Sequence, residues 1–168
     1  TTGAYITCPQ NSEAGFTASN KLITALQKVL VDILELQGQG KQAHWNVVGK
    51  NFRDTHLVLD EIIVDARTFS DIVAERIRSL HGTPDGRSAT VAATTTLPGY
   101  PEGEVDTAET INLITERLEA VVATIRGVHG GVDDEDPASA DLLNGALVRL
   151  EQFAWLVSAE NRTARKSQ

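Results

Sequence analysis

The sequence predicts an all-α protein: a bundle of four long helices with one long crossover between the second helix and the third. In four stretches of the chain, apolar residues recur at steps of three and four, the spacing of a helix with one buried face. The segment between the second and third stretches, GTPDGRSATVAATTTLPGYPEGE, is too long for a hairpin and contains several Pro and Gly residues. No stretch shows the signals of a strand.

The first helix is expected over about residues 17–46. Its buried stripe consists of Leu22, Leu26, Val29, Ile33 and Leu36. Gly38 and Gly40 interrupt this helix, and each costs about 1 kcal/mol relative to alanine in a helix interior. Propensity alone would therefore end the helix near them, whereas the family resemblance described below argues that the helix continues to Trp45.

The second helix is expected over about residues 51–81. Its apolar stripe consists of Phe52, Leu59, Ile63, Ala66, Val73 and Ile77. The long crossover that follows is typical of a bundle in which the next helix must begin at the far end. A short extra helix within the crossover is left open.

The third helix is expected to open with Asp106 as its cap and Glu109 three residues later, a pattern like a capping box. The glycine pair at 130–131 is expected to end it, after a stripe of Ile111, Ile114, Leu118, Val121, Ile125 and Val128. The fourth helix is expected to begin with Asp136 as its cap and Pro137 in the first turn, where proline is favoured. Its buried stripe consists of Leu143, Leu147, Leu150, Phe153 and Val157.

Two histidines and three acids have the spacing of a metal site: His44, His56, Asp60, Asp71 and Glu75. The last four should share one face of the second helix, because steps of four, eleven and four residues return close to the same angle at about 3.6 residues per turn. Imidazole nitrogen and carboxylate oxygen together suit iron, manganese or zinc, and suit neither calcium nor thiolate-loving ions. Each residue alone is more often a packing or solvated side chain, so the prediction rests on the set.

The length of the second helix divides these residues into two half-sites. At about 1.5 Å per residue, His56 and Glu75 are roughly 28 Å apart, so one ion cannot touch both. The short VVGKN connection should fold His44 back toward His56 and Asp60, which leaves Asp71 and Glu75 at the other end. Two copies packed antiparallel about a two-fold axis would bring unlike half-sites together. The sequence therefore predicts two equivalent metal sites shared across a dimer interface.

A helical wheel supports this interface. The metal-type residues centre about 100° from the core stripe, on a face that also carries Leu57 and Val64. An apolar pair beside carboxylates, on a face that is not the core, is expected of a buried subunit contact.

These residues resemble the Dps family, the DNA-binding proteins from starved cells, which are small members of the ferritin superfamily. The matching pieces are HWNVVGKNF at 44–52, the pair His56 and Asp60, DIVAERIRSLHGTP at 71–84, and FAWL at 153–156. The similarity covers essentially the whole chain. It implies a ferritin-like four-helix bundle as a single domain, residues 1–168, with an N-terminal tail at 1–16 and a short basic tail at 162–168.

The resemblance implies a ferroxidase centre at the two-fold interface, formed by His44, His56, Asp60, Asp71 and Glu75. Two ferrous ions per site would be oxidised, preferably by hydrogen peroxide, and the ferric product stored as mineral inside a homo-dodecamer built from two-fold dimers. The tighter iron is assigned to His44, Asp71 and Glu75, and the weaker position to His56 and Asp60. Trp45 is a candidate electron donor, although interface packing is the commoner role of such a residue.

Other functions remain to be weighed. Ferritins and bacterioferritins use Glu-x-x-His repeats for a di-iron site inside the bundle, and no Glu-x-x-His occurs in this chain. The main alternative is a DNA-compacting structural protein with secondary iron binding. A further alternative is a zinc-occupied or other metal-binding assembly without turnover.

The charge of the chain bears on its ligands. A net charge of −8 and a pI near 4.9 repel nucleic acid and attract cations. The acidic loop at 133–136, with Asp141 one turn into the last helix, resembles the family's acidic pore at the three-fold axis, and Asp136 and Asp141 are expected to line it. The alternative explanation is that acids gather at helix starts because the helix dipole favours them.

DNA binding is expected to be weak or absent at physiological salt. Residues 1–20 contain no Lys or Arg, and the C-terminal end offers only Arg162, Arg165 and Lys166, whereas each neutralised phosphate adds salt-dependent affinity. Twelve such tails on one shell could still bind multivalently.

Targeting signals and cysteine usage predict the compartment. No apolar run approaches a membrane span, and the first residues lack the pattern of a signal peptide. A cytoplasmic location is therefore expected, with association to the nucleoid left open. Cys8, the only cysteine, excludes an internal disulfide or a thiolate zinc site and is expected to be an inert tail residue.

Overall fold

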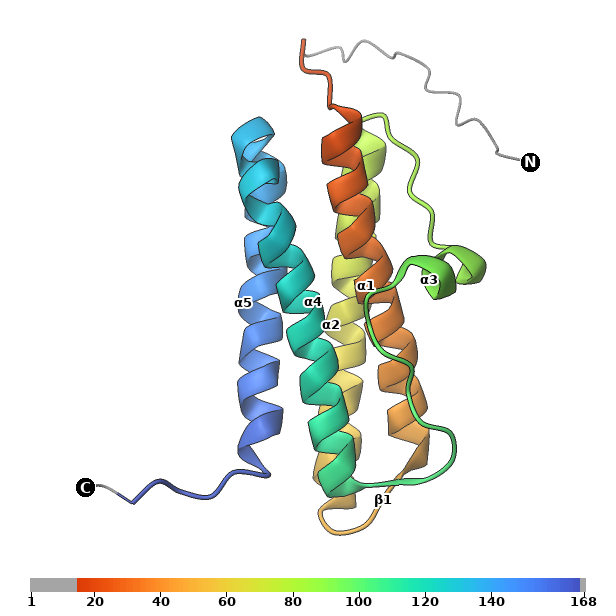
Figure 1. Cartoon of the computed structure of the whole chain (residues 1–168), viewed down its shortest axis with the longest axis vertical. Helices are drawn as coiled ribbons and strands as arrows, with labels where there is room; N and C mark the ends of the chain where they lie inside the picture. The colour runs from red at the N-terminus through yellow and green to blue at the C-terminus, as the bar shows by residue number, and fades with distance from the viewer. Residues whose placement is uncertain (1–14, 167–168) are drawn as a thin grey trace.

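The computed structural model describes residues 15–166 and shows four long helices running alongside one another (Figure 1). They are α1 (Asn20–Asn46), α2 (Phe52–Ser79), α4 (Thr107–Glu135) and α5 (Pro137–Ala159). A short helix, α3 (Ser88–Thr94), lies in the crossover between α2 and α4. The all-α bundle with a long crossover is thereby confirmed, and the extra helix is present. Cys8 and the first fourteen residues of the predicted N-terminal tail lie outside the described residues.

Two very short strands correct the expectation that the chain has none. β1 (Val47–Val48) and β2 (Val105–Asp106) pair in parallel, with Val47 beside Val105. Segments of two residues are too short to show an alternating pattern, so the sequence could not reveal them. Their pairing fixes the end of the crossover next to the turn between α1 and α2.

The core is formed largely by the predicted stripes. Every stripe residue expected on the first and fourth long helices is buried, and on α4 only Val128 is partly exposed. On α2, Phe52 is 43% exposed, and Ile62 takes the core position expected for Ile63, which is only partly buried. Both isoleucines fit a helical period, so the neighbouring helices decide which of them is covered. Within residues 15–166, no helix combines the length and apolar character needed to cross a membrane.

Helix α1 continues through both glycines, as the family resemblance implied. It begins at Asn20, three residues later than expected, because the Ser19 hydroxyl caps it by accepting a bond from the backbone N–H of Leu22 at 3.1 Å. Gly40 lies where α1 approaches α2 closely, since a Cβ placed there would lie 3.1 Å from Cγ1 of Ile63. The absence of a side chain at Gly40 allows this close packing and offsets the low helix propensity of glycine.

Helix α4 does not end at the glycine pair but continues to Glu135, so residues 133–135 form its last turn and not a loop. Tertiary contacts hold this end. Val132 is 1% exposed, and the Glu135 carboxylate accepts bonds from the backbone N–H and the hydroxyl of Ser19, both at 2.7 Å. At the other end, Asp106 caps the helix as predicted, accepting a bond from the N–H of Glu109 at 3.0 Å.

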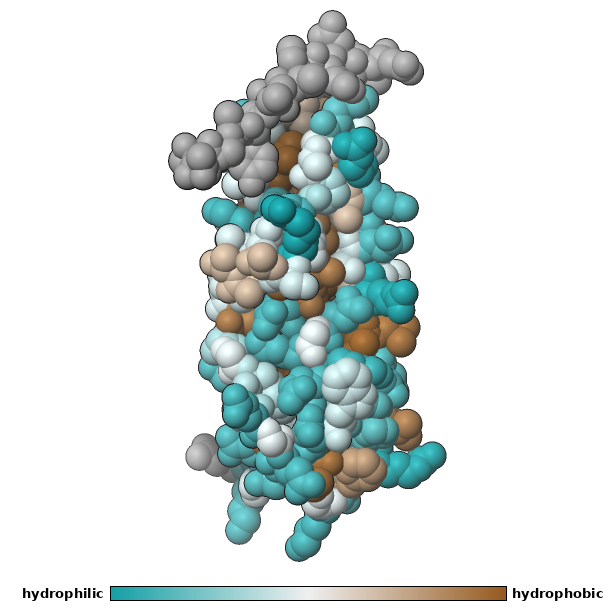
Figure 2. Space-filling view, turned by 90° about the vertical axis from the view of Figure 1, so that its right-hand side faces the viewer, coloured by the Kyte–Doolittle hydropathy of each residue, from teal (hydrophilic) through white to brown (hydrophobic). Residues whose placement is uncertain are grey.

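Two buried charged side chains attach the crossover to the bundle. The carboxylate of Asp32 on α1 accepts three bonds from the threonines at 95–96 and one from Thr124 on α4. The guanidinium of Arg117 on α4 donates to the carbonyls of residues 98–99. Buried charges require such partners, so these bonds hold the crossover against α1 and α4. The side of the molecule that carries the crossover is largely hydrophilic, with hydrophobic residues in separate patches (Figure 2).

Candidate metal centre

The two predicted histidines meet where the turn between α1 and α2 brings the helices together. His44 lies in the last turn of α1 and is 8% exposed, and His56 lies near the start of α2. Their rings stack with centroids 3.6 Å apart. Phe52 also stacks on the ring of His56, with centroids 5.0 Å apart. Phe52, which was expected in the core, therefore packs against the candidate site.

Reciprocal hydrogen bonds orient both imidazole rings. Nδ1 of His44 lies 2.9 Å from the carbonyl oxygen of His56, and Nδ1 of His56 lies 2.9 Å from the carbonyl oxygen of His44. A carbonyl oxygen can only accept, so each Nδ1 must carry the proton. In a neutral imidazole this leaves a lone pair on Nε2, the form that binds a divalent metal. Both rings therefore fit the role of metal ligand.

Asp60 lies one turn after His56 and joins the same half-site. Its Oδ1 lies 3.4 Å from Nδ1 of His44 and accepts a hydrogen bond from the ammonium group of Lys41 at 3.1 Å. That bond is the main cause that lowers the pKa of Asp60, and the nearby charges of His44, Lys41 and His56 act in the same direction. The carboxylate is therefore in its ionised, metal-binding form near neutral pH. Lys41 was missed by the sequence analysis, although its place three residues before His44 puts both on one face of a helix.

Asp71 and Glu75 lie together farther along α2. Both are exposed, and neither has a hydrogen bond or ion pair within the described part of the chain. Because α2 is unbroken, a rise of about 1.5 Å per residue separates His56 from Glu75 by roughly 28 Å. Nowhere in residues 15–166 do three His, Cys, Asp or Glu side chains converge to hold a metal ion. The structure thus places the predicted donors in two sets, one toward each end of α2.

The surface around these donors is partly apolar. Leu57 is 41% exposed and Val64 is 61% exposed, in agreement with their position on the helical wheel. Trp45, next to His44 at the end of α1, is 68% exposed. Apolar side chains that gather beside carboxylates mark a surface that another protein surface can cover.

The two residues expected to line an acidic pore have different surroundings. Asp136, between α4 and α5, is 8% exposed and accepts bonds from Arg76 at 2.7 Å and from the hydroxyl of Ser139. Burial alone would raise the pKa of Asp136, but the bonds from Ser139 and Arg76 outweigh burial and lower it. Asp136 precedes α5 as expected, but its side chain makes no capping bond to the helix. Asp141, in contrast, is exposed on α5.

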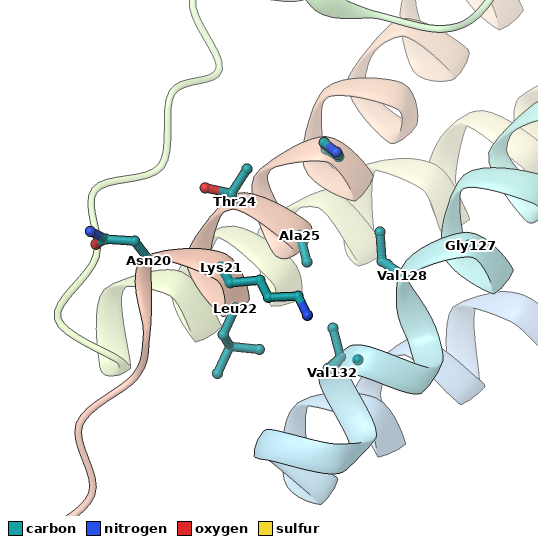
Figure 3. Close-up of a pocket in the computed structure, with 10 residues that line it drawn as sticks. Asn20, Lys21, Leu22, Thr24, Ala25, Gly127, Val128 and Val132 are labelled. Atoms are coloured by element: carbon teal, nitrogen blue, oxygen red, sulfur yellow. The ribbon is translucent and has the colours of Figure 1, made fainter.

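Two hollows in the described part of the chain lie away from the donors. A groove of about 510 Å³ between the start of α1 and the second half of α4 is lined by residues such as Lys21, Ala25 and Val128 (Figure 3). A smaller hollow of about 220 Å³ lies near Glu160, at the end of α5. Neither hollow includes a predicted metal ligand.

Comparison with known proteins defines the class. A model of the ferritin-like domain matches residues 23–166. Together with the four-helix bundle and its crossover, this match makes the chain a ferritin-like protein.

Individual relatives define the family. DNA protection during starvation protein 2 of Deinococcus radiodurans is 36% identical over 146 residues, which cover 87% of this chain but only 61% of that relative. The DNA protection during starvation protein of Agrobacterium fabrum is 31% identical over 143 residues, which cover 84% of this chain and 88% of the relative. The chain belongs to the Dps family within the ferritin-like superfamily.

Solved structures of Dps proteins agree with this assignment. Dps92 from Deinococcus radiodurans superposes with a TM-score of 0.81 at 37% identity, over 83% of this chain and 84% of that chain. The Dps of Microbacterium arborescens, solved in a high iron form, superposes with a TM-score of 0.80 at 30% identity, over 86% of this chain and 97% of that chain.

Proposed function

We propose that this Dps protein oxidises ferrous iron at a centre shared by two subunits and stores the ferric product. One subunit supplies His44, His56 and Asp60, and its two-fold partner supplies Asp71 and Glu75. The observation that carries this proposal is the fixed tautomer of the two histidines, which leaves an Nε2 lone pair on each. Helix α2, which carries His56, also bears two exposed carboxylates, Asp71 and Glu75, that have no hydrogen-bond or ion-pair partner among the described residues. The high iron form of the Microbacterium arborescens Dps supports iron as the substrate.

The donor set supports oxidation of iron over permanent binding. Nitrogen and oxygen donors suit iron, and too few of them surround each ion to complete its coordination shell, so an oxidant can approach. Two ferrous ions each give one electron to one molecule of hydrogen peroxide, which takes up two protons and becomes two molecules of water. Because both electrons are delivered together, no hydroxyl radical is released.

The residues have separate roles in this proposal. His44, Asp71 and Glu75 hold the tighter iron, whereas His56 and Asp60 hold the second, weaker one. Trp45, adjacent to His44 and largely exposed in the single chain, is the candidate donor of a further electron; its alternative role is packing against the partner subunit.

The proposed particle is a homo-dodecamer built from two-fold dimers, with the ferric mineral inside it. Asp141 is proposed to line its acidic iron-entry pore, since its side chain is exposed close to the turn between α4 and α5. Asp136 was expected to line the same pore, but its carboxylate is engaged by Arg76 and Ser139. The proposal therefore gives Asp136 the role of fixing that turn.

Addition of ferrous iron and then peroxide to the metal-free assembly tests the proposed activity, with the ferric product followed by absorbance. We expect rapid oxidation of about two ferrous ions per site, as a two-metal centre requires. Added zinc should slow the reaction, because it competes for the same nitrogen and oxygen donors. Oxidation no faster than in buffer would contradict the enzyme and favour a metal-binding or DNA-compacting role.

A further inference from the structure

The groove between the start of α1 and the second half of α4 combines an apolar base with positive charge. Leu22 and Val132 line it and are buried, at 2% and 1% exposure. Lys21 and Lys28, both exposed, line it as well, and the side chain of Lys21 extends from α1 toward α4 (Figure 3). No acidic residue of the described chain is among its lining residues. The groove therefore suits a segment with apolar side chains and a neutral or slightly negative charge.

Two glycines of α4 keep this groove open. Gly127 and Gly131 lie one turn apart inside the helix, where each costs about 1 kcal/mol relative to alanine. A Cβ at Gly127 would meet no atom within 4 Å, and a Cβ at Gly131 would meet only Cε of Lys21, at 4.0 Å. Packing within the described chain therefore requires glycine at neither position, in contrast to Gly40. A segment that passes close over α4 would account for both, because glycine lets a second backbone approach.

The chain enters the bundle at one end of the same groove. The backbone N–H and the hydroxyl of Ser19 donate to the carboxylate of Glu135, both at 2.7 Å, so the residues before Ser19 begin where α1 and α4 meet. Gly15 has a φ of +77°, a left-handed conformation that glycine adopts readily in tight turns. Residues 1–14, which lie outside the described residues, include the apolar run at 4–6 and one acid, Glu13, but no Lys or Arg. Their composition complements the lining of the groove.

We propose that the segment at 4–14 folds back from Gly15 and lies in this groove of its own subunit. From Tyr5 to Gly15 an extended chain spans about 33–36 Å. The return from Gly15 to Asn20 takes at most about 18 Å of this length. The groove runs from Asn20 to Lys28, which is about 12 Å at 1.5 Å per residue, so Tyr5 reaches its far part.

The segment of the same subunit is the favoured occupant, because its attachment at the end of the groove gives it a high effective concentration there. The apolar run at 4–6 covers the apolar lining, and Glu13 lies close to Lys21. The stretch that the sequence marks as a tail is thereby part of the folded subunit. This inference is independent of the proposed metal centre.

Cys8, the only cysteine of the chain, allows a cross-linking test on the assembled protein. Gly131→Cys places a second thiol in the groove. Gly145→Cys on α5 is the matched control, because a Cβ there also meets open space. The neighbouring Asn144 contacts His129 of α4 at 2.8 Å, so the control lies at a similar level of the bundle but outside the groove. With oxidised glutathione, Gly131→Cys should form a disulfide with Cys8 within one chain, seen as faster migration on a non-reducing gel, and Gly145→Cys should not.

The same gel separates the other occupants. A disulfide between two chains would overturn the proposal in favour of a segment from a neighbouring subunit. Equal cross-linking of the two variants, or no cross-link within one chain, would overturn it as well.

A second measurement needs no new cysteine. Gly131→Leu fills the groove and should speed the reaction of Cys8 with a maleimide roughly tenfold, as expected if the undocked state makes up about a tenth of the wild-type population. Gly145→Leu should leave the rate at its wild-type value. Gly127→Leu replaces Gly131→Leu if the latter does not assemble. Equal rates in the wild type and in the groove-filling variant would contradict docking.

Discussion

His44 and His56 each have two functions at the scale of single residues. The Nε2 atom of each ring is the proposed metal donor, and the backbone carbonyl of each residue orients the ring of the other. A backbone carbonyl remains when a side chain is replaced. Removal of one ring should therefore leave the other in its metal-binding tautomer, so the contribution of each histidine can be measured separately.

Replacement of His56 by alanine should remove the weak metal position and keep the tight one. The carbonyl of residue 56 still orients His44, so the tight phase of a Co²⁺ titration should stay near its wild-type affinity. The weak phase loses a ligand and should weaken by at least the roughly 10- to 100-fold typical of a lost partner of a metal ligand. Equal weakening of both phases would show that the two histidines serve one ion, contrary to the assignment.

At the scale of helices, apolar periodicity predicted the four long helices and most of their buried residues. Tertiary contacts decided where α4 ends and which isoleucine of α2 is buried. The stripes of α1 and α5 are buried as predicted. The end of α4 was predicted too early, because a propensity argument cannot see that Val132 is buried and that Glu135 binds Ser19. Which of Ile62 and Ile63 is buried in the core likewise depends on how α1 packs against α2 near Gly40. The apolar pattern of α2 alone carries no information about that packing.

The two glycines of α1 should respond differently to alanine. A Cβ at Gly38 meets no atom within 4 Å, so Gly38→Ala should stabilise the chain by about 1 kcal/mol through helix propensity. That gain corresponds to a rise in melting temperature of about 2–4 °C for a chain of this size. Gly40→Ala should gain less or lose stability, because its Cβ would crowd Ile63 at 3.1 Å. Equal gains in thermal melts at matched protein concentration would contradict the close approach of α1 and α2.

The contact of Asp136 with Arg76 and Ser139 joins α2 to the turn between α4 and α5 and should be sensitive to acid. The folded chain lowers the pKa of Asp136 below its ordinary value of 3.8. The ionised carboxylate therefore contributes stability above about pH 4, and this contribution is lost as the pH falls through the lower folded pKa. Melting temperatures of the wild type and Asp136→Asn, compared across this range, should differ at neutral pH and converge in acid. A difference in melting temperature that stays constant across this pH range would rule out a stabilising role for the ionised carboxylate of Asp136.

At the scale of the whole molecule, the sequence predicted that the candidate donors lie in two separate sets, because their separation depends only on helix rise. His56 and Glu75 are too far apart on one helix for any packing to bring them together. Lys41 was not foreseen, because its contact with Asp60 depends on how α1 and α2 pack. The engagement of Asp136 was missed for the same reason, since its partner Arg76 lies sixty residues earlier on α2.

The assembled protein should bind DNA weakly or not at all near physiological salt. The net charge is −8, and the basic residues of the C-terminal tail are few, whereas phosphate contacts lose affinity steeply as salt rises. A gel shift with the intact assembly and with a truncation after Asn161 measures this. Tight binding at about 150 mM salt that survives the truncation would indicate a basic surface elsewhere on the particle.

The central claim, that each metal centre is shared by two subunits, is tested most directly by mixing inactive variants. Asp71→Ala/Glu75→Ala subunits keep one half-site, and His44→Ala/His56→Ala subunits keep the other. Each variant alone should lack rapid ferrous oxidation. After dissociation and reassembly together, every mixed dimer should regain one complete centre, and the rate of peroxide-dependent oxidation should recover in proportion to the fraction of mixed dimers. Assemblies that verifiably contain both subunits but show no recovery would contradict the shared centre.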